Sequence, residues 1–356
     1  MAEKMISVVI PVYNAEEYIK ECLDSVINQT IGIEHIELIV VDDSSTDRSL
    51  QYLMEYEKKY PDSILLVPLE ENGGQANARN IGMDYITAPY FAFVDADDWV
   101  EPDIYEKMLG AMEKCECDIV HCFHTEHLEG CEEHPVRTKN EEGIYFIGSR
   151  KMEEDPSFEN SGGIWSFLYC TKWIREHGLR FKNFKKYEDN YWSGMVFFFA
   201  ESVYMVPESL YHYRIRELSN SHSRNDKEHF ERLSVELEKL KFYQEQGLFE
   251  ANYEKIQKEF LELFYSNTLH IICCQFDYIP LDIIREMQLT VKEIYPDYLE
   301  YCKKSGRNLE EVLTVAFDFP VEMWEEYKKA YLEWVQNRKS DRIVQFYAKM
   351  RSALKL

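Results

Sequence analysis

Short apolar runs alternate with amphipathic segments through the first hundred residues, and this alternation leaves few folds open. The apolar runs predict strands over residues 7–12, 37–41, 64–67 and 90–94. A helix is expected after the first strand, with Asn14 and Glu17 as an Asn-X-X-Glu capping pair and a buried stripe over residues 19–27. Strands that alternate with helices predict an α/β fold, in which a mostly parallel sheet carries helices on both faces.

Aspartates stand at the ends of two of these expected strands. Asp42 and Asp43 end the second strand, and Asp95 and Asp97 follow the fourth. Because the carboxyl ends of parallel strands lie along one edge of a sheet, where ligands of such folds bind, we expect these side chains to share one acidic pocket. Crowded carboxylates are costly unless a cation, a donor-rich ligand or water compensates for their charge. The arrangement therefore predicts a cation-dependent ligand site.

The rest of the chain divides into two further regions. A stretch rich in Glu, Gly, Pro and Asn interrupts the pattern over about residues 126–163. Short strands are also expected at residues 118–123, 144–147 and 203–206. The last third of the chain shows only amphipathic helical patterns. We therefore expect a first domain at 1–224, with halves at 1–125 and 126–224, followed by an all-helical domain at 225–356.

The net charge of −25 argues against a protein whose main task is to grip nucleic acid, because phosphate binding requires a basic face. No segment has the order of a secretory signal, and no apolar run approaches the ~18 residues that span a bilayer. We therefore expect a cytoplasmic protein. The basic segment 338–356 forms an amphipathic helix that either makes a peripheral contact with the inner face of a membrane or docks on its own domain, the commoner arrangement.

Cysteine usage predicts reduced thiols. The chain has 9 cysteines, an odd number without a secretory signal. Cysteines and histidines crowd between Cys115 and His134, which raises a zinc hypothesis. No Cys-X2-Cys pair occurs there, however, and the strand expected at 118–123 would point alternate residues to opposite faces. Buried apolar cysteines are the simpler explanation.

Four motifs follow one another on the expected elements. They are Val-Ile-Pro-Val-Tyr-Asn at 9–14, Val-Asp-Asp-Ser-Ser-Thr-Asp at 41–47, Asn-Gly-Gly at 72–74 with Ala-Arg-Asn-Ile-Gly at 78–82, and Val-Asp-Ala-Asp-Asp at 94–98. Together they closely resemble the family 2 glycosyltransferases of polysaccharide-biosynthesis type, over about residues 5–215. The resemblance implies the GT-A fold, which is Rossmann-like, and the transfer of a sugar from a nucleotide donor.

The resemblance implies a reaction that uses a metal ion. In the Asp-X-Asp motif of the family, Asp97 would be the principal metal ligand, and Asp95 would contact the ribose or the water shell of the cation. Mn²⁺ or Mg²⁺ is expected, because each prefers oxygen ligands and binds one or two carboxylates together with phosphate oxygens and water. Such a cation neutralises the diphosphate as it leaves the sugar. The alternative is that residues 95–98 form a solvated turn.

The same resemblance assigns the nucleotide pocket. Asp43 would accept a hydrogen bond from the base, and Pro11 and Tyr13 would line the base pocket. An ionised carboxylate accepts hydrogen bonds but does not donate them, so it suits the N–H edge of uracil or thymine and favours a UDP-sugar. Asp42 is alternatively a cap of the following helix. Arg79 is either a phosphate or base contact or an ordinary charge on a helix surface.

The catalytic base is expected at the start of a later helix. The family commonly has a Glu-Asp pair there, and Glu188-Asp189 fits the pattern. By resemblance, Asp189 would take the proton from the acceptor hydroxyl, and Glu188 would orient or tune it. The alternative is that both acids only interact with the helix dipole.

Two further segments have open roles. Trp165 either stacks on an acceptor sugar or belongs to the core. The segment His212-Tyr213-Arg214, followed by Arg216 and Ser219, resembles a family segment whose basic residues would reach the diphosphate; the alternative is a loop that anchors the helical region.

We therefore expect a metal-dependent inverting glycosyltransferase that moves a sugar from a nucleotide-diphosphate donor to a saccharide or lipid-linked acceptor in polysaccharide or cell-envelope synthesis. One alternative is a nucleotidyltransferase that makes nucleotide sugars, although its usual Gly-rich loop has no counterpart at residues 11–14. A second alternative is a non-catalytic sugar-nucleotide binder. The helical region is open to a membrane, a partner protein or a second copy of the chain in a homo-oligomer.

Overall fold

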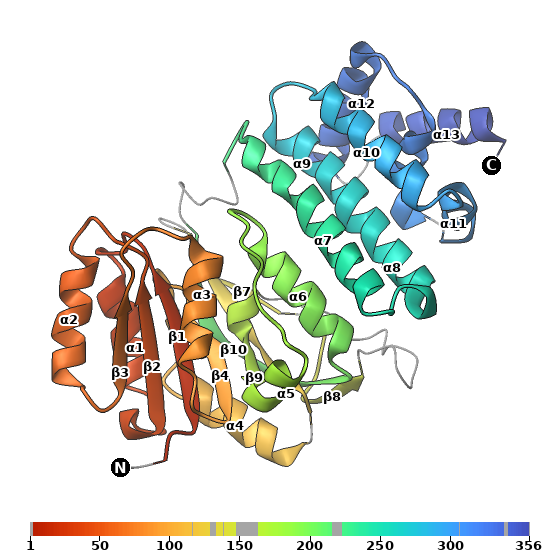
Figure 1. The fold of residues 1–356 in the computed structure, drawn as a ribbon. Helices are drawn as coiled ribbons and strands as arrows, with labels where there is room; N and C mark the ends of the chain where they lie inside the picture. The colour runs from red at the N-terminus through yellow and green to blue at the C-terminus, as the bar shows by residue number, and fades with distance from the viewer. Residues whose placement is uncertain are drawn as a thin grey trace. The chain divides into compact units, whose positions relative to one another are not determined.

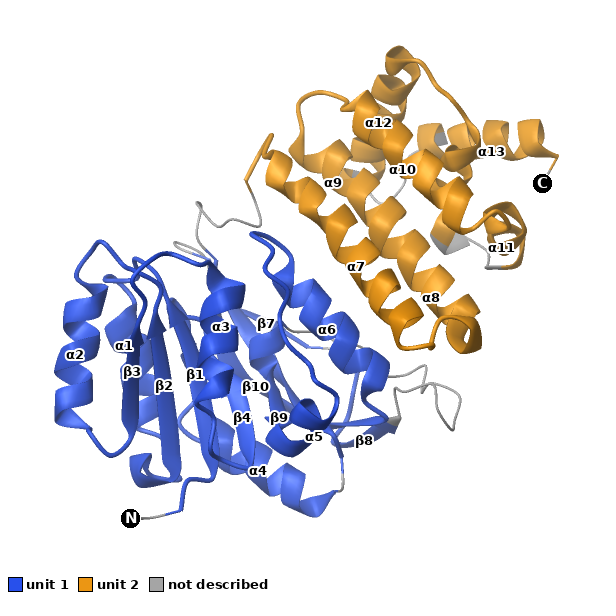
Figure 2. Ribbon diagram, in the orientation of Figure 1, with its two compact units in different colours: residues 1–217 blue, residues 218–356 orange. Residues whose placement is uncertain are grey.

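The computed structural model describes residues 3–115, 117–128, 133–137, 139–146, 163–215, 223–305, 307–337 and 341–355. The chain divides into two compact units, Met1–Glu217 and Leu218–Leu356 (Figure 2). This division falls close to the domain boundary expected at residue 224. The assignment of separate functions to the two parts stays a prediction.

Unit 1 is built on one sheet (Figure 1). Its strands in the described ranges are β1 (Ile6–Val12), β2 (Ile36–Asp42), β3 (Ile64–Pro68), β4 (Tyr90–Phe93), β5 (Trp99–Val100), β6 (Ile119–Leu128), β7 (His134–Val136), β8 (Gly143–Phe146), β9 (Phe167–Cys170) and β10 (Ser202–Ile215). They lie in the order β3-β2-β1-β4-β9-β6-β10-β5, while β7 pairs with β6 and β8 with β10. β1 to β4 are parallel, β6 is parallel to β10, and β9 is antiparallel to both β4 and β6. The predicted, mostly parallel sheet is confirmed.

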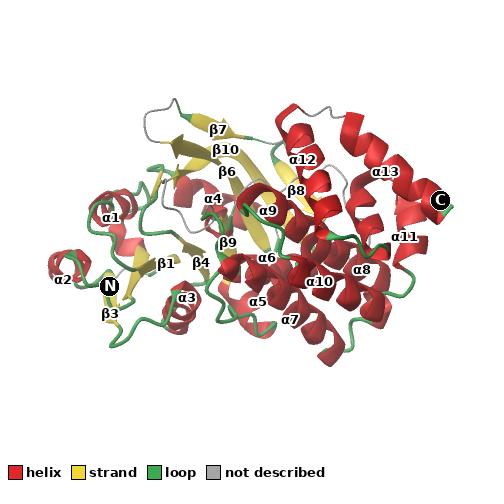
Figure 3. Ribbon diagram, turned by 90° about the horizontal axis from the view of Figure 1, so that it is seen from above, coloured by secondary structure: helices red, strands yellow, loops and turns green. Residues whose placement is uncertain are grey.

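Helices cover both faces of the sheet (Figure 3). One face carries α1 (Ile19–Ile27), α2 (Ser49–Lys59) and α4 (Ile104–Lys114), and the other carries α3 (Gln75–Asp84), α5 (Thr171–Glu176) and α6 (Glu188–Phe199). β1 is fully buried, and the side chains of its alternate residues point to opposite faces of the sheet. Val8 and Ile10 join the core that includes α1 and α4, whereas Val9 meets α3. At this contact Gly82 lets the helix approach closely, since a Cβ there would lie 2.4 Å from Val9 Cγ1.

The expected strands reappear with shifted bounds. Those at 7–12, 37–41, 64–67 and 90–94 correspond to β1, β2, β3 and β4, and the short one near 144–147 corresponds to β8. Those at 118–123 and 203–206 are the beginnings of the longer β6 and β10. β5 and β7 are missed, because two and three residues are too few to show a periodicity. Residues 147–162, in the stretch expected to be irregular, lie outside the described part of the chain.

The capping role expected for Asn14 is wrong. α1 begins at Ile19, and its N-cap residue, Tyr18, makes no side-chain hydrogen bond to the helix. Asn14 instead adopts a φ of 48°, and its side-chain oxygen accepts a hydrogen bond from Thr46 N at 2.8 Å. Its backbone N–H donates to Ser45 Oγ at 3.0 Å. Asn14 therefore joins the loop after β1 to the loop after β2.

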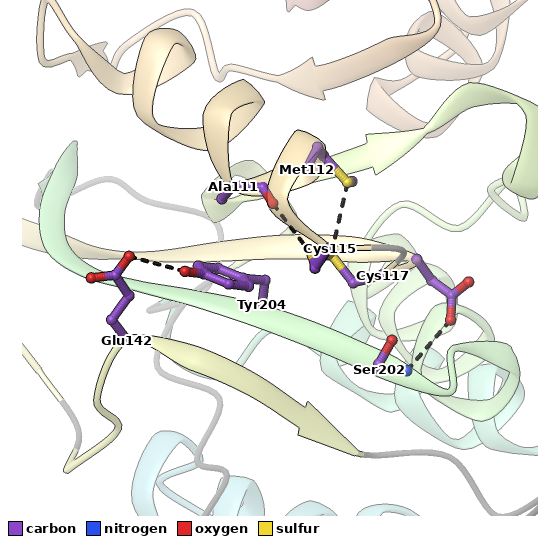
Figure 4. Close-up of a disulfide and its surroundings, with 8 residues drawn as sticks. Ala111, Met112, Cys115, Cys117, Glu142, Ser202 and Tyr204 are labelled. Atoms are coloured by element: carbon purple, nitrogen blue, oxygen red, sulfur yellow. Dashed lines mark hydrogen bonds between the residues drawn. A yellow bond between two sulfur atoms is a disulfide. The ribbon is translucent and has the colours of Figure 1, made fainter.

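The turn from α4 into β6 carries a disulfide between Cys115 and Cys117 (Figure 4). This bond corrects the expectation that all cysteines are reduced thiols. Six other cysteines in the described residues are free, and Cys131 lies outside them. The zinc hypothesis gains no support, since the described residues contain no group of three or more His, Cys, Asp or Glu side chains that could hold a metal ion.

Unit 2 is all-helical throughout its described residues, as predicted. Its helices are α7 (Glu231–Glu245), α8 (Tyr253–Phe260), the π-helix η6 (Leu261–Ser266), α9 (Asn267–Gln275), α10 (Leu281–Ile294), α11 (Tyr298–Ser305), the 3₁₀ segment η7 (Arg307–Ala316), α12 (Val321–Asn337) and α13 (Asp341–Leu354). Shorter 3₁₀ turns are η1 (Ile33–His35) and η2 (Ile164–Ser166) in unit 1, and η4 (Lys227–Phe230) and η5 (Glu250–Asn252) in unit 2. Within the described ranges, no helix combines the length and apolarity needed to cross a bilayer.

The basic C-terminal helix α13 docks on its own unit. Its apolar residues Ile343, Tyr347 and Met350 are buried. The Tyr347 hydroxyl lies 3.1 Å from that of Tyr327 in α12. The apolar face that a membrane would require is therefore occupied within the unit, and the docked alternative describes this helix.

Candidate active site

The predicted nucleotide and metal residues lie at one edge of the sheet. β1, β2 and β4 are parallel, so their carboxyl ends meet at this edge (Figures 1 and 3). Backbone hydrogen bonds from Asp43 N to Val12 O at 2.8 Å and from Val94 N to Val9 O at 3.1 Å carry the pairing to the strand ends. Pro11 is buried in β1, whereas Tyr13, just beyond the strand, is 51% exposed.

Asp43 holds the turn that starts α3. Its side chain is buried, and its two carboxylate oxygens accept hydrogen bonds from Gly73 N and Gly74 N, each at 2.8 Å. Gly74 has a φ of 85°, which glycine adopts without strain. Each carboxylate oxygen has a second lone pair, so this anchoring role leaves capacity to accept a further hydrogen bond.

Asp42 lies beside Asp43 but serves the next loop. Its Oδ2 accepts a hydrogen bond from Ser45 N at 3.1 Å, ahead of α2, while its buried Oδ1 has no partner among the described residues. Asp42 therefore does not cap α2 itself, because α2 begins at Ser49; Asp42 instead binds the loop that precedes the helix.

The loop after β4, residues 95–98, is the acidic loop, and Asp98 is its buried anchor. Asp98 Oδ2 accepts a hydrogen bond from the Tyr211 hydroxyl at 2.7 Å, and its Oδ1 accepts one from Arg214 N at 2.8 Å. Burial, together with the carboxylates of Asp97 and Asp95, raises the pKa of Asp98 well above its usual value. Asp98 therefore ties the acidic loop to β10, which contradicts a freely solvated turn.

Asp95 and Asp97 are partly exposed members of the same loop. Asp95 Oδ1 accepts a hydrogen bond from Arg79 Nη2 at 2.7 Å, and its backbone N–H donates to the Tyr211 hydroxyl at 3.1 Å. The backbone oxygen of Asp97 accepts a hydrogen bond from Arg214 Nε at 2.9 Å. Arg79 of α3 therefore holds the Asp95 side chain, and Tyr211 and Arg214 of β10 hold the backbone of the loop.

Arg79 is buried between two carboxylates, so its interpretation as an ordinary helix-surface charge is wrong. Its Nη2 donates to Asp95, and its Nη1 donates to Glu188 Oε1 at 2.8 Å. The guanidinium also lies 5.5 Å from the centre of the Phe181 ring. Burial opposes the charge of Arg79, but the carboxylates of Asp95 and Glu188 outweigh this effect and raise its pKa.

The two acids that begin α6 have different surroundings. Glu188 is buried, and its burial raises the pKa of its carboxyl to about 7; Arg79 acts against this rise, and the carboxylate of Asp189 adds to it. Asp189 is partly exposed, and its Oδ1 accepts a hydrogen bond from Asn190 N at 2.8 Å. Tyr187, with a φ of 66°, makes the turn that leads into the helix.

The end of β10 is packed against the acidic loop. Trp99 stacks on His212 at 5.0 Å between ring centres, and the Arg214 guanidinium lies 4.6 Å from the Trp99 ring centre. Arg214 also pairs with Glu21 at 2.6 Å. Arg216 and Ser219 lie outside the described residues.

Trp165 packs on the sheet. Its ring stacks on Tyr211 with 4.2 Å between ring centres and on Tyr213 with 5.4 Å. It is partly buried against the core under α1 and α4, which agrees with the core alternative rather than with an open sugar-stacking platform.

The donor atoms of the acidic loop fit a hard cation that brings further ligands with it. Among the described residues, no cluster of three or more acidic, His or Cys side chains forms a complete cage. Mg²⁺ and Mn²⁺ need no such cage, because one or two carboxylates combine with phosphate oxygens and water. Asp97, alone or with Asp95, would match this number of carboxylates, and both side chains are partly exposed.

Sequence analysis missed two residues of this site. Gln75 lies one helical turn before Arg79 on α3, and Tyr211 contacts both Asp95 and Asp98. The four-residue spacing of Gln75 and Arg79 was the available signal for the first. Nothing local marks Tyr211, because its partners are more than a hundred residues away in the chain.

Known proteins share this arrangement of elements and motifs. The sequence model of the family "Glycosyl transferase family 2" matches residues 7–170. The chain is 32% identical over 284 residues to the putative glycosyltransferase EpsH of Bacillus subtilis (strain 168), with 78% of each protein covered. It is also 36% identical over 225 residues to the minor teichoic acid biosynthesis protein GgaB of the same organism. That match covers 60% of this chain and 23% of GgaB.

A solved structure shares the fold over nearly the whole chain. Residues 1–349 of S. aureus TarS, in complex with UDP-GlcNAc, match with a TM-score of 0.57 and 17% identity, covering 99% of this chain and 91% of that one. This likeness supports the GT-A fold with its helical C-terminal region. The identity to EpsH over 78% of each protein, together with the family match, shows that the chain belongs to the family 2 glycosyltransferases.

Proposed function

We propose that this glycosyltransferase is metal-dependent and inverting, and that it transfers a sugar from a UDP-sugar to a saccharide or lipid-linked acceptor in polysaccharide or cell-envelope synthesis. One observation carries the proposal: Arg79 joins the acidic loop, through Asp95, to Glu188 at the start of α6. This contact supports one shared site, because it joins the proposed donor-side motif to the proposed base-side motif, which lies far away in the sequence.

The donor pocket is assigned to the loops after β1 and β2. Asp43 would accept a hydrogen bond from the base through its unused lone pairs, and Pro11 and Tyr13 would line the pocket. A uracil base suits this acceptor, and the UDP-GlcNAc in the TarS structure supports a UDP-sugar for a protein of the same fold.

Mn²⁺ or Mg²⁺ would be held by Asp97 as principal ligand, with Asp95 at the cation's water shell or at the ribose. Bound there, the cation would neutralise negative charge on the diphosphate. The bond from Arg79 to Asp95 Oδ1 leaves Asp95 the further lone pairs of its carboxylate for the water shell or the ribose.

Asp189 is assigned as the general base. The acceptor hydroxyl would give its proton to the Asp189 carboxylate while its oxygen forms a bond to the anomeric carbon. The bond from that carbon to the diphosphate oxygen breaks on the opposite face, and UDP leaves with the electron pair. The partial exposure of Asp189 suits contact with an acceptor, whereas buried Glu188 suits an orienting role.

The acceptor is assigned by class. GgaB is named for teichoic acid synthesis, and this relationship favours an acceptor of the cell envelope. The nucleotidyltransferase alternative is not favoured, because the chain belongs to a glycosyltransferase family and residues 11–14 contain no glycine.

The test compares Asp189→Asn with the wild type. UDP release from UDP-glucose, UDP-galactose and UDP-GlcNAc is measured with Mn²⁺, with and without saccharide acceptors, and UDP binding is followed by thermal shift. We expect the variant to retain UDP binding and to lose about a hundredfold or more of the transfer rate. The exposed Asp62→Asn serves as the matched control. Unchanged transfer by Asp189→Asn would remove Asp189 from the mechanism, and donor binding without transfer by the wild type would favour a non-catalytic binder.

A further inference from the structure

The first turns of α3 supply two side chains to the space between the acidic loop and α6. Arg79 donates to Asp95 and to Glu188, at 2.7 and 2.8 Å. Gln75 completes the group when its amide is oriented with its oxygen toward Arg79 Nη2, at 2.7 Å, because its nitrogen then donates to Glu188 Oε1 at 3.2 Å. We call these four residues, Gln75, Arg79, Asp95 and Glu188, the Arg79 bridge.

The floor beneath the Arg79 bridge is aromatic and belongs to the base side of the site. Phe181 lies under the guanidinium and stacks on Trp192 with 4.5 Å between ring centres and an angle of 8°. Trp192 is a fully buried residue of α6, the helix that carries Glu188 and Asp189. A shift of α6 would therefore disturb both the floor and the ion pair.

Stability is a poor explanation for this arrangement. Arg79 is 2% exposed, and its Nε is buried without a hydrogen-bond partner among the described residues. A buried donor left unpaired is destabilising, because it loses its hydrogen bonds to water. Buried ion pairs are often no more stabilising than apolar residues of similar volume, because both charges lose their hydration. The geometry instead serves to hold two carboxylates from distant segments at a defined separation.

We infer that Arg79, oriented by Gln75, is a positioning residue that sets the placement of the base-bearing start of α6 relative to the donor-bearing acidic loop. This inference rests on the proposed function, since it gives Asp95 to the donor side and Asp189 to the acceptor side. It differs from the expected contact of Arg79 with phosphate or base, because both of its Nη atoms already bind protein carboxylates.

The shape of the arginine side chain is essential to this role. A guanidinium is planar and presents separate N–H groups in fixed directions, so it holds two carboxylates at once. A lysine ammonium is a single charged centre on a flexible stem, and it would keep a positive charge without fixing the separation. Arg79→Lys therefore separates the loss of geometry from the loss of charge.

Donor binding should reach α6 through the Arg79 bridge. In this proposal, bound UDP with Mn²⁺ would order the acidic loop, and Arg79 would pass this ordering to the first turn of α6. The experiment is hydrogen exchange by mass spectrometry on the full chain, with and without UDP and Mn²⁺, and it requires no turnover. We expect ligand-induced protection of residues 188–195 in the wild type and loss of most of that protection in Arg79→Lys.

The matched control is Arg175→Lys. Arg175 lies on α5, on the same face of the sheet, and donates to Ile86 O at 2.8 Å, away from the acidic loop. We expect this variant to retain the protection of α6. Gln75→Ala is a second test variant, and we expect it to lose part of the protection of α6. Arg79→Lys and Gln75→Ala should each keep the affinity for UDP within about threefold of the wild type.

Steady-state kinetics provide a readout that a merely structural role would not move. We expect Arg79→Lys to lower kcat about 10- to 100-fold with little change in the donor KM. The double variant Arg79→Lys/Glu188→Gln should have a kcat no lower than that of the slower single variant, because both changes break the same contact. The inference is overturned if Arg79→Lys keeps the ligand-induced protection of α6, or if the two changes multiply in kcat. If the wild type binds no UDP, the proposed function fails, and the inference falls with it.

Discussion

At the level of single residues, burial separates the roles of two adjacent acids. Glu188 and Asp189 are neighbours in the first turn of α6, where the helix dipole favours both. Glu188 is buried, accepts a hydrogen bond from Arg79 of α3 and has a pKa raised to about 7, whereas Asp189 is partly exposed. The dipole alternative therefore accounts for the position of the pair in the helix but not for the different surroundings of its two members.

The raised pKa of Glu188 predicts a dependence of stability on pH. The folded state holds the Glu188 proton more tightly than the unfolded state, whose pKa is near 4.5. This contribution to stability is fully present below pH 4.5 and is lost as the pH rises to about 7. We expect the free energy of unfolding of the wild type, relative to Glu188→Gln, to fall across this window by up to about 3 kcal/mol and to stay level above it.

The measurement is urea unfolding of both proteins at a series of pH values between 4.5 and 8.5, a range chosen to bracket the expected change. The difference between the two proteins isolates Glu188 from the many other acids. A difference that is constant across the series would show that Glu188 titrates normally in the folded protein.

Tyr211 is predicted to stabilise the acidic loop. Its hydroxyl accepts from Asp95 N and donates to Asp98, so Tyr211→Phe leaves two partly or fully buried groups unpaired. We expect a loss of about 1–3 kcal/mol of stability together with weaker UDP binding in the presence of Mn²⁺. The exposed Tyr85→Phe is the control for removal of a hydroxyl. Equal midpoints of urea unfolding for the two variants would contradict this role.

At the level of secondary structure, α3 is the element that assembles the site. The turn before it binds Asp43 through Gly73 and Gly74, and its own side chains bind Asp95 and Glu188. The placement of α3 on the sheet therefore affects the donor side and the base side together. A displacement of α3 would disturb the donor side and the base side of the site together. A change in α1 or α4 would reach the site only from the other face of the sheet.

Gly82 tests this dependence on α3. A Cβ at residue 82 would lie 2.4 Å from Val9 Cγ1 in β1, so Gly82→Ala must push the helix from the sheet. We expect a loss of about 1–3 kcal/mol of stability and reduced UDP binding. Gly110→Ala in α4 is the matched control, because a Cβ there meets nothing within 4 Å, and it should stabilise its helix by up to about 1 kcal/mol. Thermal unfolding and UDP titration check both, and an unaffected Gly82→Ala would show that α3 tolerates displacement.

At the level of the whole molecule, the negative charge of the chain leads us to predict that donor binding requires a cation. The chain carries −25, and the acidic loop adds local negative charge where an anionic diphosphate is proposed to bind. Repulsion between like charges opposes donor binding unless a cation lies between them. We expect UDP to raise the thermal midpoint only with Mn²⁺ or Mg²⁺ present, and excess EDTA to abolish the shift. A full shift of the thermal midpoint in EDTA would contradict the metal proposal. In a parallel test, Asp97→Asn should reduce the cation-dependent shift more than Asp95→Asn does.

The two compact units predict a separable catalytic domain. The described candidate residues all belong to Met1–Glu217, which has its own buried hydrophobic core. We propose residues 1–224 as the catalytic domain and residues 225–356 as a helical domain with another task. A chain ending at residue 224 should unfold cooperatively and bind UDP with Mn²⁺ within about tenfold of the full chain. Failure of this shortened chain to fold would show that the helical domain is required for the stability of residues 1–224.

The nucleotide-side motifs were predictable because they are local. Each lies within a few residues of the end of an apolar strand, and parallel strands bring their ends together without further information. The acidic loop and the Asp43 loop therefore follow from residues 1–100. The role of Asn14 did not follow, because its hydrogen bonds reach Ser45 and Thr46 in the next loop, and a capping pattern cannot register such partners.

Periodicity in the sequence was enough to predict the α/β architecture and the helical C-terminal part, and the resemblance of four motifs was enough to predict the family. They were not enough to assign Arg79, whose two carboxylate partners lie 16 and 109 residues away. Hydrophobic patterns report which face of an element is buried, but they carry no information on which polar groups meet in the interior. That pairing arises when α3 and α6 pack on the same face of the sheet, and it appears only in the folded molecule.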